Sequence, residues 1–108
     1  MSFVKVVAII RPDVLDKVEN SLKEANVPGV SIMHVEGYGE YANYYRQDRM
    51  VQHIQVEVFI SKKRATEIAE LIMESAHTGT DGDGIVAVIP VDSVYHIRTK
   101  RKCDDEAC

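Results

Sequence analysis

The sequence has little cysteine, no excess of positive charge and no long hydrophobic run. Its 13 Lys and Arg residues are outnumbered by 17 Asp and Glu residues, and the net charge of −4 argues against a nucleic-acid-binding protein. A membrane-spanning helix needs about 20 apolar residues in a row, and no stretch approaches that length. The N-terminal residues lack a basic region and a small-residue cleavage site, which favours a strand over a signal peptide. We therefore expect a cytoplasmic protein that binds no nucleic acid and does not insert into a membrane.

The motifs of common catalytic and metal sites are also absent. No serine lies in a Gly-x-Ser-x-Gly elbow, and neither His-Glu-x-x-His nor a paired Cys-x-x-Cys pattern occurs. The four histidines are spread over separate predicted elements, so a zinc site has no support. Residues 81–84 do not start a calcium loop, because Ile85 takes a ligand position and no glutamate closes the loop. The sequence predicts a protein that is not an enzyme and that holds no metal.

The hydrophobic pattern predicts a single α+β domain. Apolar or alternating runs predict strands at residues 3–10, 30–36, 54–60, 85–89 and 94–98. Stripes at helical spacing predict helices from Asp13 to Ala25 and from Lys62 to Ala76. The order β-α-β-β-α-β plus a short strand is that of a ferredoxin-like double βαβ sandwich with an antiparallel sheet. We expect this domain to span residues 1–99, followed by a charged tail at residues 100–108.

One face of such a sheet is not covered by helices. The first and fourth strands are apolar on both faces, so the uncovered face would expose hydrophobic side chains to water. Packing of these faces against one another in a closed oligomer would remove them from water. The alternative is a monomer with scattered surface valines.

A glycine-rich segment at residues 78–84 follows the second predicted helix. It contains three glycines and two aspartates in seven residues, more than a simple helix-to-strand connection needs. Successive backbone N–H groups in such a loop can bind an anion. An ordinary turn with a glycine cap is the alternative. The turn at residues 37–39 and the basic residues 98–102 lie at the ends of other elements, so an oligomer could bring them to one cleft where arginine binds phosphate.

These segments resemble the PII signal-transduction proteins along the chain up to about Thr99. The resemblance is carried by Ile9-Ile10-Arg11-Pro12, by residues 35–39 (Val-Glu-Gly-Tyr-Gly), by the loop at 78–84, and by Ile97-Arg98-Thr99. It implies a closed ferredoxin-like homotrimer that binds adenine nucleotides between subunits and docks onto target proteins. Residues 40–52 correspond to the family's T-loop, and residues 77–84 to its B-loop.

The resemblance also implies a set of nucleotide-binding residues. Three departures reduce the positive charge of this site: Ile85 and Thr80 stand where the family has lysines, and His96 stands where it has a second arginine. We therefore expect ADP or AMP to compete well with ATP, because each phosphate contact normally relies on a cation. The expected nucleotide-binding residues are Ser31, Gly37, Tyr38, Gly39, Phe59, Gly79, Gly82, Asp83, Gly84, His96 and Arg98.

The expected partner-binding loop also departs from the family pattern. It is short, and Tyr41 replaces the glutamine that binds magnesium and 2-oxoglutarate, so 2-oxoglutarate sensing and uridylylation are both in doubt. Aromatic and arginine residues are typical of binding hot spots. Those expected to contact a target protein are Tyr41, Tyr44, Tyr45, Arg46 and Arg49.

The only cysteines, Cys103 and Cys108, lie near the C-terminus. A disulfide between them would close a small loop and add little stability, which favours a reversible redox pair over a structural bond, with two free thiols as the alternative. The short T-loop and the two cysteines resemble those of PII-like variants associated with inorganic-carbon uptake and carboxysomes. This resemblance implies bicarbonate as a further ligand, and a bicarbonate transporter or a carbon-fixation component as the target. The alternatives are a nitrogen-regulatory PII that controls an ammonium transporter or an enzyme, a trimeric metal-tolerance protein and, last, an acylphosphatase.

Overall fold

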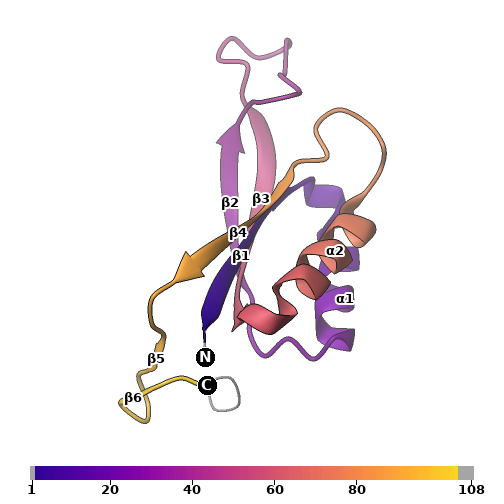
Figure 1. Cartoon of the computed structure of the whole chain (residues 1–108). Helices are drawn as coiled ribbons and strands as arrows, with labels where there is room; N and C mark the ends of the chain where they lie inside the picture. Colours follow the sequence, from indigo (N-terminus) through magenta and orange to yellow (C-terminus); the bar gives the residue numbers. More distant parts are fainter. Residues whose placement is uncertain (1, 105–108) are drawn as a thin grey trace.

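Two helices pack on one face of a four-stranded antiparallel sheet in the computed structural model, which describes residues 2–104 (Figure 1). The strands follow the order β2-β3-β1-β4 across the sheet. The predicted α+β ferredoxin-like fold is confirmed. The elements are β1 (Phe3–Ile10), η1 (Pro12–Val14), α1 (Leu15–Glu24), β2 (Ser31–Gly37), β3 (Val51–Ser61), η2 (Lys62–Arg64), α2 (Ala65–Ala76) and β4 (Ile85–Val91).

The core lies between the sheet and the two helices. Alternate residues of β1 and β3 point toward the helices, as a two-residue period requires, and each of these side chains is at most 5% exposed. Burial of one such aliphatic side chain contributes roughly 1.5–3 kcal/mol. The core residues of the strands are Val4, Val6, Ala8, Ile10, Ile54, Val56, Val58 and Ile60, and those of the helices include Val18, Leu22, Ile68 and Ile72.

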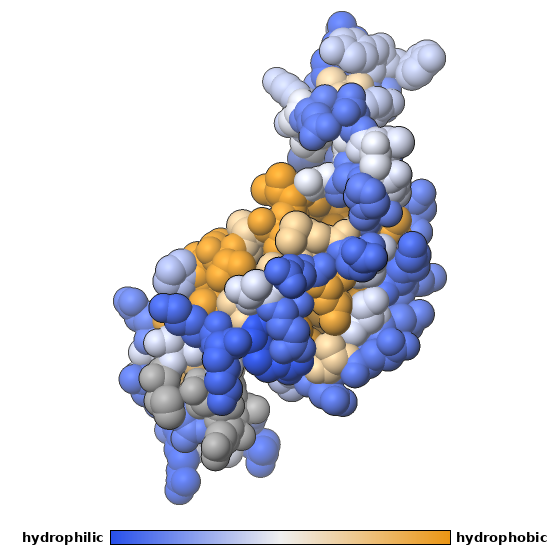
Figure 2. Space-filling model, turned by 45° about the vertical axis from the view of Figure 1, so that its right-hand side comes forward, coloured by the Kyte–Doolittle hydropathy of each residue, from blue (hydrophilic) through white to orange (hydrophobic). Residues whose placement is uncertain are grey.

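The opposite face of the sheet carries exposed apolar side chains. Phe59 is 48% exposed, and Ile85 and Ile89 on the edge strand β4 are 63% and 42% exposed. Figure 2 shows apolar surface across the middle of the molecule, between hydrophilic regions at the top and the bottom. The face also holds a polar pair, since Lys5 Nζ lies 3.5 Å from Glu57 Oε1. This uncovered face is the one for which the sequence predicts a subunit contact.

The C-terminal segment differs from the predicted single strand at residues 94–98. Only Tyr95–His96 forms a strand (β5), and it pairs with Arg101–Lys102 (β6) in a separate two-stranded sheet. The backbone turns at Lys100, whose φ is 58°, so residues on both sides of residue 99 belong to one hairpin. Hairpin pairing was missed because its second strand has no apolar alternation. The hairpin lies at the opposite end of the sheet from the loop between α2 and β4 (Figure 1).

Cys103 follows this hairpin and is 5% exposed, and its backbone N–H donates to the carbonyl oxygen of Val94 at 2.7 Å. Cys108 lies outside the described residues, and with it the predicted Cys103–Cys108 pair. In the described part of the chain, neither helix combines the length and the apolar character that crossing a membrane requires.

Candidate functional site

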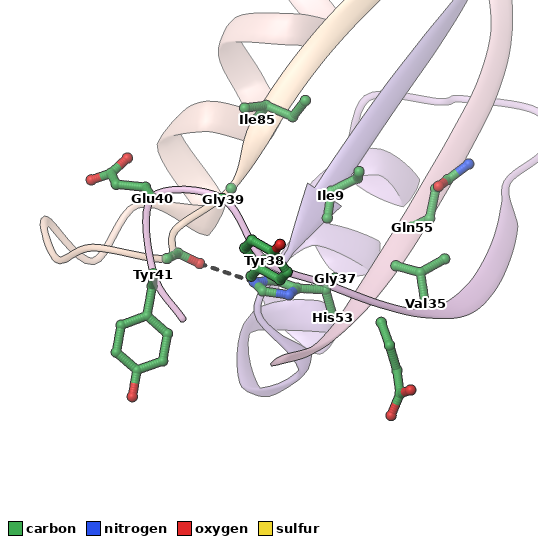
Figure 3. Close-up of a pocket in the computed structure, with 13 residues that line it drawn as sticks. Ile9, Val35, Gly37, Tyr38, Gly39, Glu40, Tyr41, His53, Gln55 and Ile85 are labelled. Carbon is green, nitrogen blue, oxygen red and sulfur yellow. Dashed lines mark hydrogen bonds between the residues drawn. The ribbon is translucent and has the colours of Figure 1, made fainter. Parts of the chain in front are cut away.

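A pocket of about 420 Å³ lies where β2 ends and β4 begins (Figure 3). The turn after β2 forms one wall, and the glycine loop, defined here as residues 78–84, forms another. The sheet supplies the floor through side chains of the uncovered face. The lining residues are Ile9, Val35, Glu36, Gly37, Tyr38, Gly39, Glu40, Tyr41, His53, Gln55, Gly82, Gly84 and Ile85.

Two glycines allow the glycine loop to lie directly on the end of β1. Gly84 has a φ of +99°, and a Cβ at this position would overlap the carbonyl oxygen of Ile9 and lie 2.8 Å from its carbon. Gly82 has a φ of +94°, and a Cβ there would lie 3.2 Å from both Arg11 Nη2 and Tyr41 Cβ. Only glycine adopts these φ values without strain and leaves room for the Ile9 backbone at Gly84 and for the Arg11 and Tyr41 side chains at Gly82.

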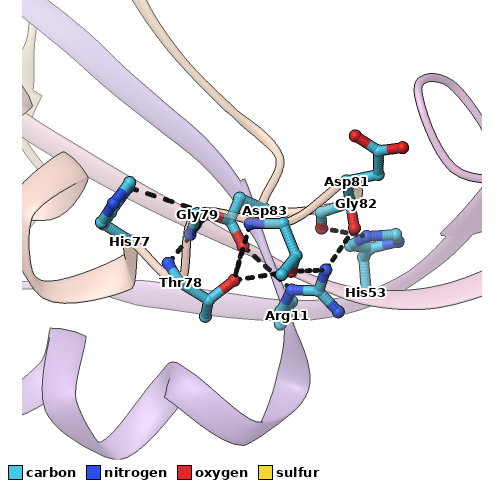
Figure 4. Close-up of polar contacts among 9 residues, drawn as sticks. Arg11, His53, His77, Thr78, Gly79, Asp81, Gly82 and Asp83 are labelled. Atoms are coloured by element: carbon cyan, nitrogen blue, oxygen red, sulfur yellow. Dashed lines mark hydrogen bonds and ion pairs between the residues drawn. The ribbon is translucent and has the colours of Figure 1, made fainter.

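The carboxylate of Asp83 holds the first half of the glycine loop (Figure 4). It accepts hydrogen bonds from the backbone N–H of Thr78 at 2.8 Å, from that of Gly79 at 2.9 Å, and from the Thr78 hydroxyl. The hydrogen bonds from Thr78, with those from Gly79 and Arg11, hold the pKa of Asp83 well below its ordinary value. Asp83 is therefore ionised at neutral pH and fixes the loop from within.

Arg11 connects this loop to the end of β1. Its Nε donates to Asp83 Oδ1 at 3.0 Å, and its Nη2 donates to Thr80 Oγ1 at 2.8 Å and to the carbonyl oxygen of Asp81. From the other side, His53 Nε2 lies 3.3 Å from the carbonyl oxygen of Gly82 and joins the loop to β3. The loop is thus anchored to two strands before any ligand binds, which reduces the entropy cost of ordering it.

The projecting loop, residues 38–50, extends beyond the sheet (Figure 1). Its first residues, 38–41, line the pocket. Arg46 lies at its centre and forms ion pairs with Glu36 at 3.0 Å and Asp48 at 2.9 Å. The guanidinium of Arg49 lies 5.0 Å from the centre of the Tyr44 ring, a cation–π distance. Tyr45 is 99% exposed. The loop holds its own shape and presents a tyrosine to solvent.

The structure brings some of the predicted nucleotide-binding residues to the pocket. Asp83 and Gly79 belong to the glycine loop without lining the pocket. Ser31 and Phe59 lie toward the other end of their strands, where Ser31 pairs with Glu57, and His96 and Arg98 lie in the C-terminal segment. The predicted residues that line it are Gly37, Tyr38, Gly39, Gly82 and Gly84.

Sequence reasoning missed several lining residues and one anchor. Gln55 belongs to the alternation that predicted a strand at residues 54–60, whereas His53 lies before that predicted strand, because the structure begins β3 at Val51. The odd positions of both residues place them on the uncovered face. Tyr41 was predicted as a partner contact but also lines the pocket. Arg11 was quoted only as part of a motif, because nothing in the local pattern shows that residues 11 and 83 meet.

Known proteins resemble this chain over almost its whole length. The family model described as nitrogen regulatory protein P-II matches residues 3–101. The nitrogen regulatory protein GlnK2 of Haloferax mediterranei is 34% identical over 101 residues, which cover 87% of this chain and 82% of GlnK2. Nitrogen regulatory protein P-II of Synechocystis sp. is 34% identical over 110 residues, 95% and 97% of the two chains. A crystal structure of Arabidopsis thaliana PII bound to citrate matches with a TM-score of 0.84 and 32% identity, covering 98% of this chain and 92% of that one.

Proposed function

Because the chain belongs to the P-II family of nitrogen regulatory proteins, we propose that it is a non-enzymatic cytoplasmic regulator that binds an adenine nucleotide at the pocket. The observation that carries the proposal is the pocket itself, bounded by an anchored glycine loop. Its volume of about 420 Å³ lies in the ordinary range for small-molecule sites. Ligand binding there would change the projecting loop, which supplies Tyr38, Gly39, Glu40 and Tyr41 to the same pocket.

The floor of the pocket suits a base, and the wall formed by the glycine loop suits a phosphate chain. Ile9, Val35 and Ile85 offer apolar surface to a base, with the Tyr38 side chain beside them (Figure 3). The part of the glycine loop that lines the pocket, Gly82 and Gly84, would offer backbone N–H groups to phosphate. No Lys or Arg is among the described lining residues. This supports a preference for ADP or AMP over ATP.

We propose that the active form is a closed homotrimer with the pocket between subunits. The exposed Phe59 and Ile89 on the uncovered sheet face support a contact between copies. Ser31, Phe59, His96 and Arg98 lie away from the pocket of their own chain, so they would complete the pocket of a neighbouring subunit. Arg98 would then bring the cation that the pocket of a single chain lacks.

The oligomer is tested by light scattering after size-exclusion chromatography. Wild-type protein should have three times the 12.1 kDa mass of the chain. Phe59→Glu and Ile89→Glu place a charge on the uncovered face and should dissociate the trimer. Met73→Glu changes a side chain that is 52% exposed on α2 and should leave the mass unchanged. A wild-type monomer would contradict the trimer.

The regulated process has two candidates. Control of nitrogen metabolism, through an ammonium transporter or an enzyme, is supported by relatives described as nitrogen regulatory proteins. Control of inorganic-carbon uptake or fixation, with bicarbonate as a further ligand, is supported by the short projecting loop and the two C-terminal cysteines. Thermal shifts with 2-oxoglutarate, citrate and bicarbonate, each with and without nucleotide, distinguish them, because a ligand that binds the native state raises Tm.

Nucleotide binding is tested by titration calorimetry with AMP, ADP and ATP. Wild-type protein should bind at least one of them saturably, and Tyr38→Ala should weaken binding about tenfold because it removes ring contacts at the pocket. Tyr45→Ala is the matched control, since Tyr45 lies at the exposed part of the projecting loop and does not line the pocket. Absence of saturable binding by all three nucleotides would overturn the proposed function.

A further inference from the structure

Two carboxylates from different loops meet beside the pocket. Glu40 follows the turn after β2 and lines the pocket, and Asp81 precedes Gly82 in the glycine loop. The two loops approach each other closely here, because a Cβ at Gly82 would lie 3.2 Å from Tyr41 Cβ. A hydrogen bond from Asp81 and the charge of Asp81 both raise the pKa of Glu40. The charge of Asp83 acts on Glu40 in the same direction. Negative charge is therefore concentrated where the two loops approach each other.

The nearby arginines do not neutralise this pair. The guanidinium of Arg11 forms its ion pair with Asp83, and its contact with Asp81 is to the backbone carbonyl, not to the carboxylate. Arg46 forms ion pairs with Glu36 and Asp48. Among the described residues, no salt bridge engages Glu40 or Asp81.

We propose that Glu40 and Asp81 act as a charge filter that sets how many phosphates a bound nucleotide carries, favouring one phosphate over three. This inference rests on the proposed function, because it assigns specificity to residues of the same pocket. Gly82 and Gly84 line the pocket on either side of Asp83, and Asp81 immediately precedes Gly82. A phosphate chain held by the glycine loop therefore lies next to the carboxylate pair. Each further phosphate adds negative charge near Glu40 and Asp81.

The size of the effect follows from the charge that is added. At neutral pH, ATP carries about two more negative charges than AMP. In water, a fixed charge at about twice the 4 Å separation of a direct ion pair changes affinity about twofold for each added charge. Neutralising one carboxylate should therefore raise the affinity for ATP relative to AMP about fourfold, and neutralising both about tenfold or more. The same effect should shrink at high salt because the groups are near the surface.

The experiment measures Kd for AMP, ADP and ATP in wild type, Glu40→Gln, Asp81→Asn and the double variant, at 50 and 500 mM salt. We expect the AMP affinity to change little, the ADP affinity to rise, and the ATP affinity to rise most. Glu70→Gln on the exposed surface of α2 changes net charge equally and should leave the ratio unchanged. Glu40→Asp keeps the charge and should keep the wild-type ratio.

The outcomes separate this inference from the function on which it rests. Wild-type binding with equal changes for AMP, ADP and ATP in the variants would overturn the charge filter and leave the proposed function intact. That result would arise if cations of a neighbouring subunit already neutralised Glu40 and Asp81. If no nucleotide binds wild-type protein, both the function and the filter fail.

Discussion

Replacement of Gly84 by alanine should be the most damaging glycine substitution in this chain. A Cβ at Gly84 would overlap the carbonyl oxygen of Ile9, a backbone atom that cannot rotate away, and φ is +99°. A left-handed φ costs an L-residue about 1–2 kcal/mol, and relief of overpacking costs about 1–3 kcal/mol. We therefore expect Gly84→Ala to lower the free energy of unfolding by about 2–5 kcal/mol, a large part of the roughly 5–15 kcal/mol typical of native proteins.

The measurement is urea unfolding at one fixed protein concentration, because subunit association stabilises the native state in a concentration-dependent way. With a denaturant slope of about 1–3 kcal/mol per molar for a small protein, the urea midpoint of Gly84→Ala should fall by at least about 0.7 M. The urea midpoint of Gly82→Ala should fall less, because the added Cβ would lie 3.2 Å from Arg11 Nη2 and the arginine side chain can move.

Gly29→Ala is the control for these substitutions. A Cβ at Gly29 would have no heavy atom within 4 Å, and its φ is not in the left-handed range. Alanine at a compatible position restricts the unfolded chain and should leave stability unchanged or raise it by about 0.4–1 kcal/mol. If Gly84→Ala unfolds at the same urea concentration as Gly29→Ala, the close approach of the glycine loop to β1 is refuted.

Three further predictions concern the loop anchor, the core and the projecting loop. Folding lowers the pKa of Asp83, so its ionised carboxylate stabilises the fold above the unfolded-state pKa of about 3.9, and this stabilisation is lost as the pH falls below that value. The difference in urea midpoint between wild type and Asp83→Asn should therefore be constant from pH 5 to 7 and shrink below pH 4. A difference unchanged at pH 2.5 would contradict this. Ile72→Ala should lower the free energy of unfolding by about 2–5 kcal/mol, measured by urea unfolding, because Ile72 is 0% exposed. Met73→Ala should lower it by under about 1 kcal/mol, because Met73 is 52% exposed, and equal losses would refute the core assignment. Arg46→Gln should leave the urea midpoint almost unchanged yet speed hydrogen exchange of residues 38–50, since it breaks the exposed ion pairs with Glu36 and Asp48. Unchanged exchange would show that these pairs do not order the loop.

The sequence predicts the elements that have a strong period. The strand alternation from Ile54 to Ile60 repeats over several residue pairs, and the helical stripe that includes Ile68 and Ile72 repeats over several turns. The structure confirms both elements. The short strand at Tyr95–His96 has no such repeat. Its pairing with residues 101–102 depends on a turn at Lys100 with positive φ, which the local pattern does not show.

The sequence predicts only those parts of the candidate site whose residues lie close together along the chain. The three glycines of the glycine loop stand out in the sequence, and two of them line the pocket. Contacts between distant residues leave no such signal: Arg11 and Asp83 are separated by 72 positions, yet their side chains lie 3.0 Å apart. They meet because β1 and β4 are neighbours in the sheet, so the end of one strand adjoins the start of the other. Topology, rather than residue pattern, therefore determines which charges meet at this pocket.

The pocket has one rigid wall, the glycine loop, and one less constrained wall, the start of the projecting loop. This difference would let a bound ligand change the conformation of the projecting loop. The glycine loop is fixed to β1 through Arg11 and to β3 through His53, so ligand binding has little left to order there. The projecting loop is held by hydrogen bonds within its own backbone and by exposed ion pairs of Arg46, which are worth little in water. A ligand that contacts both walls would therefore change the projecting loop more than the glycine loop, and the exposed Tyr45 would carry that change to a target protein.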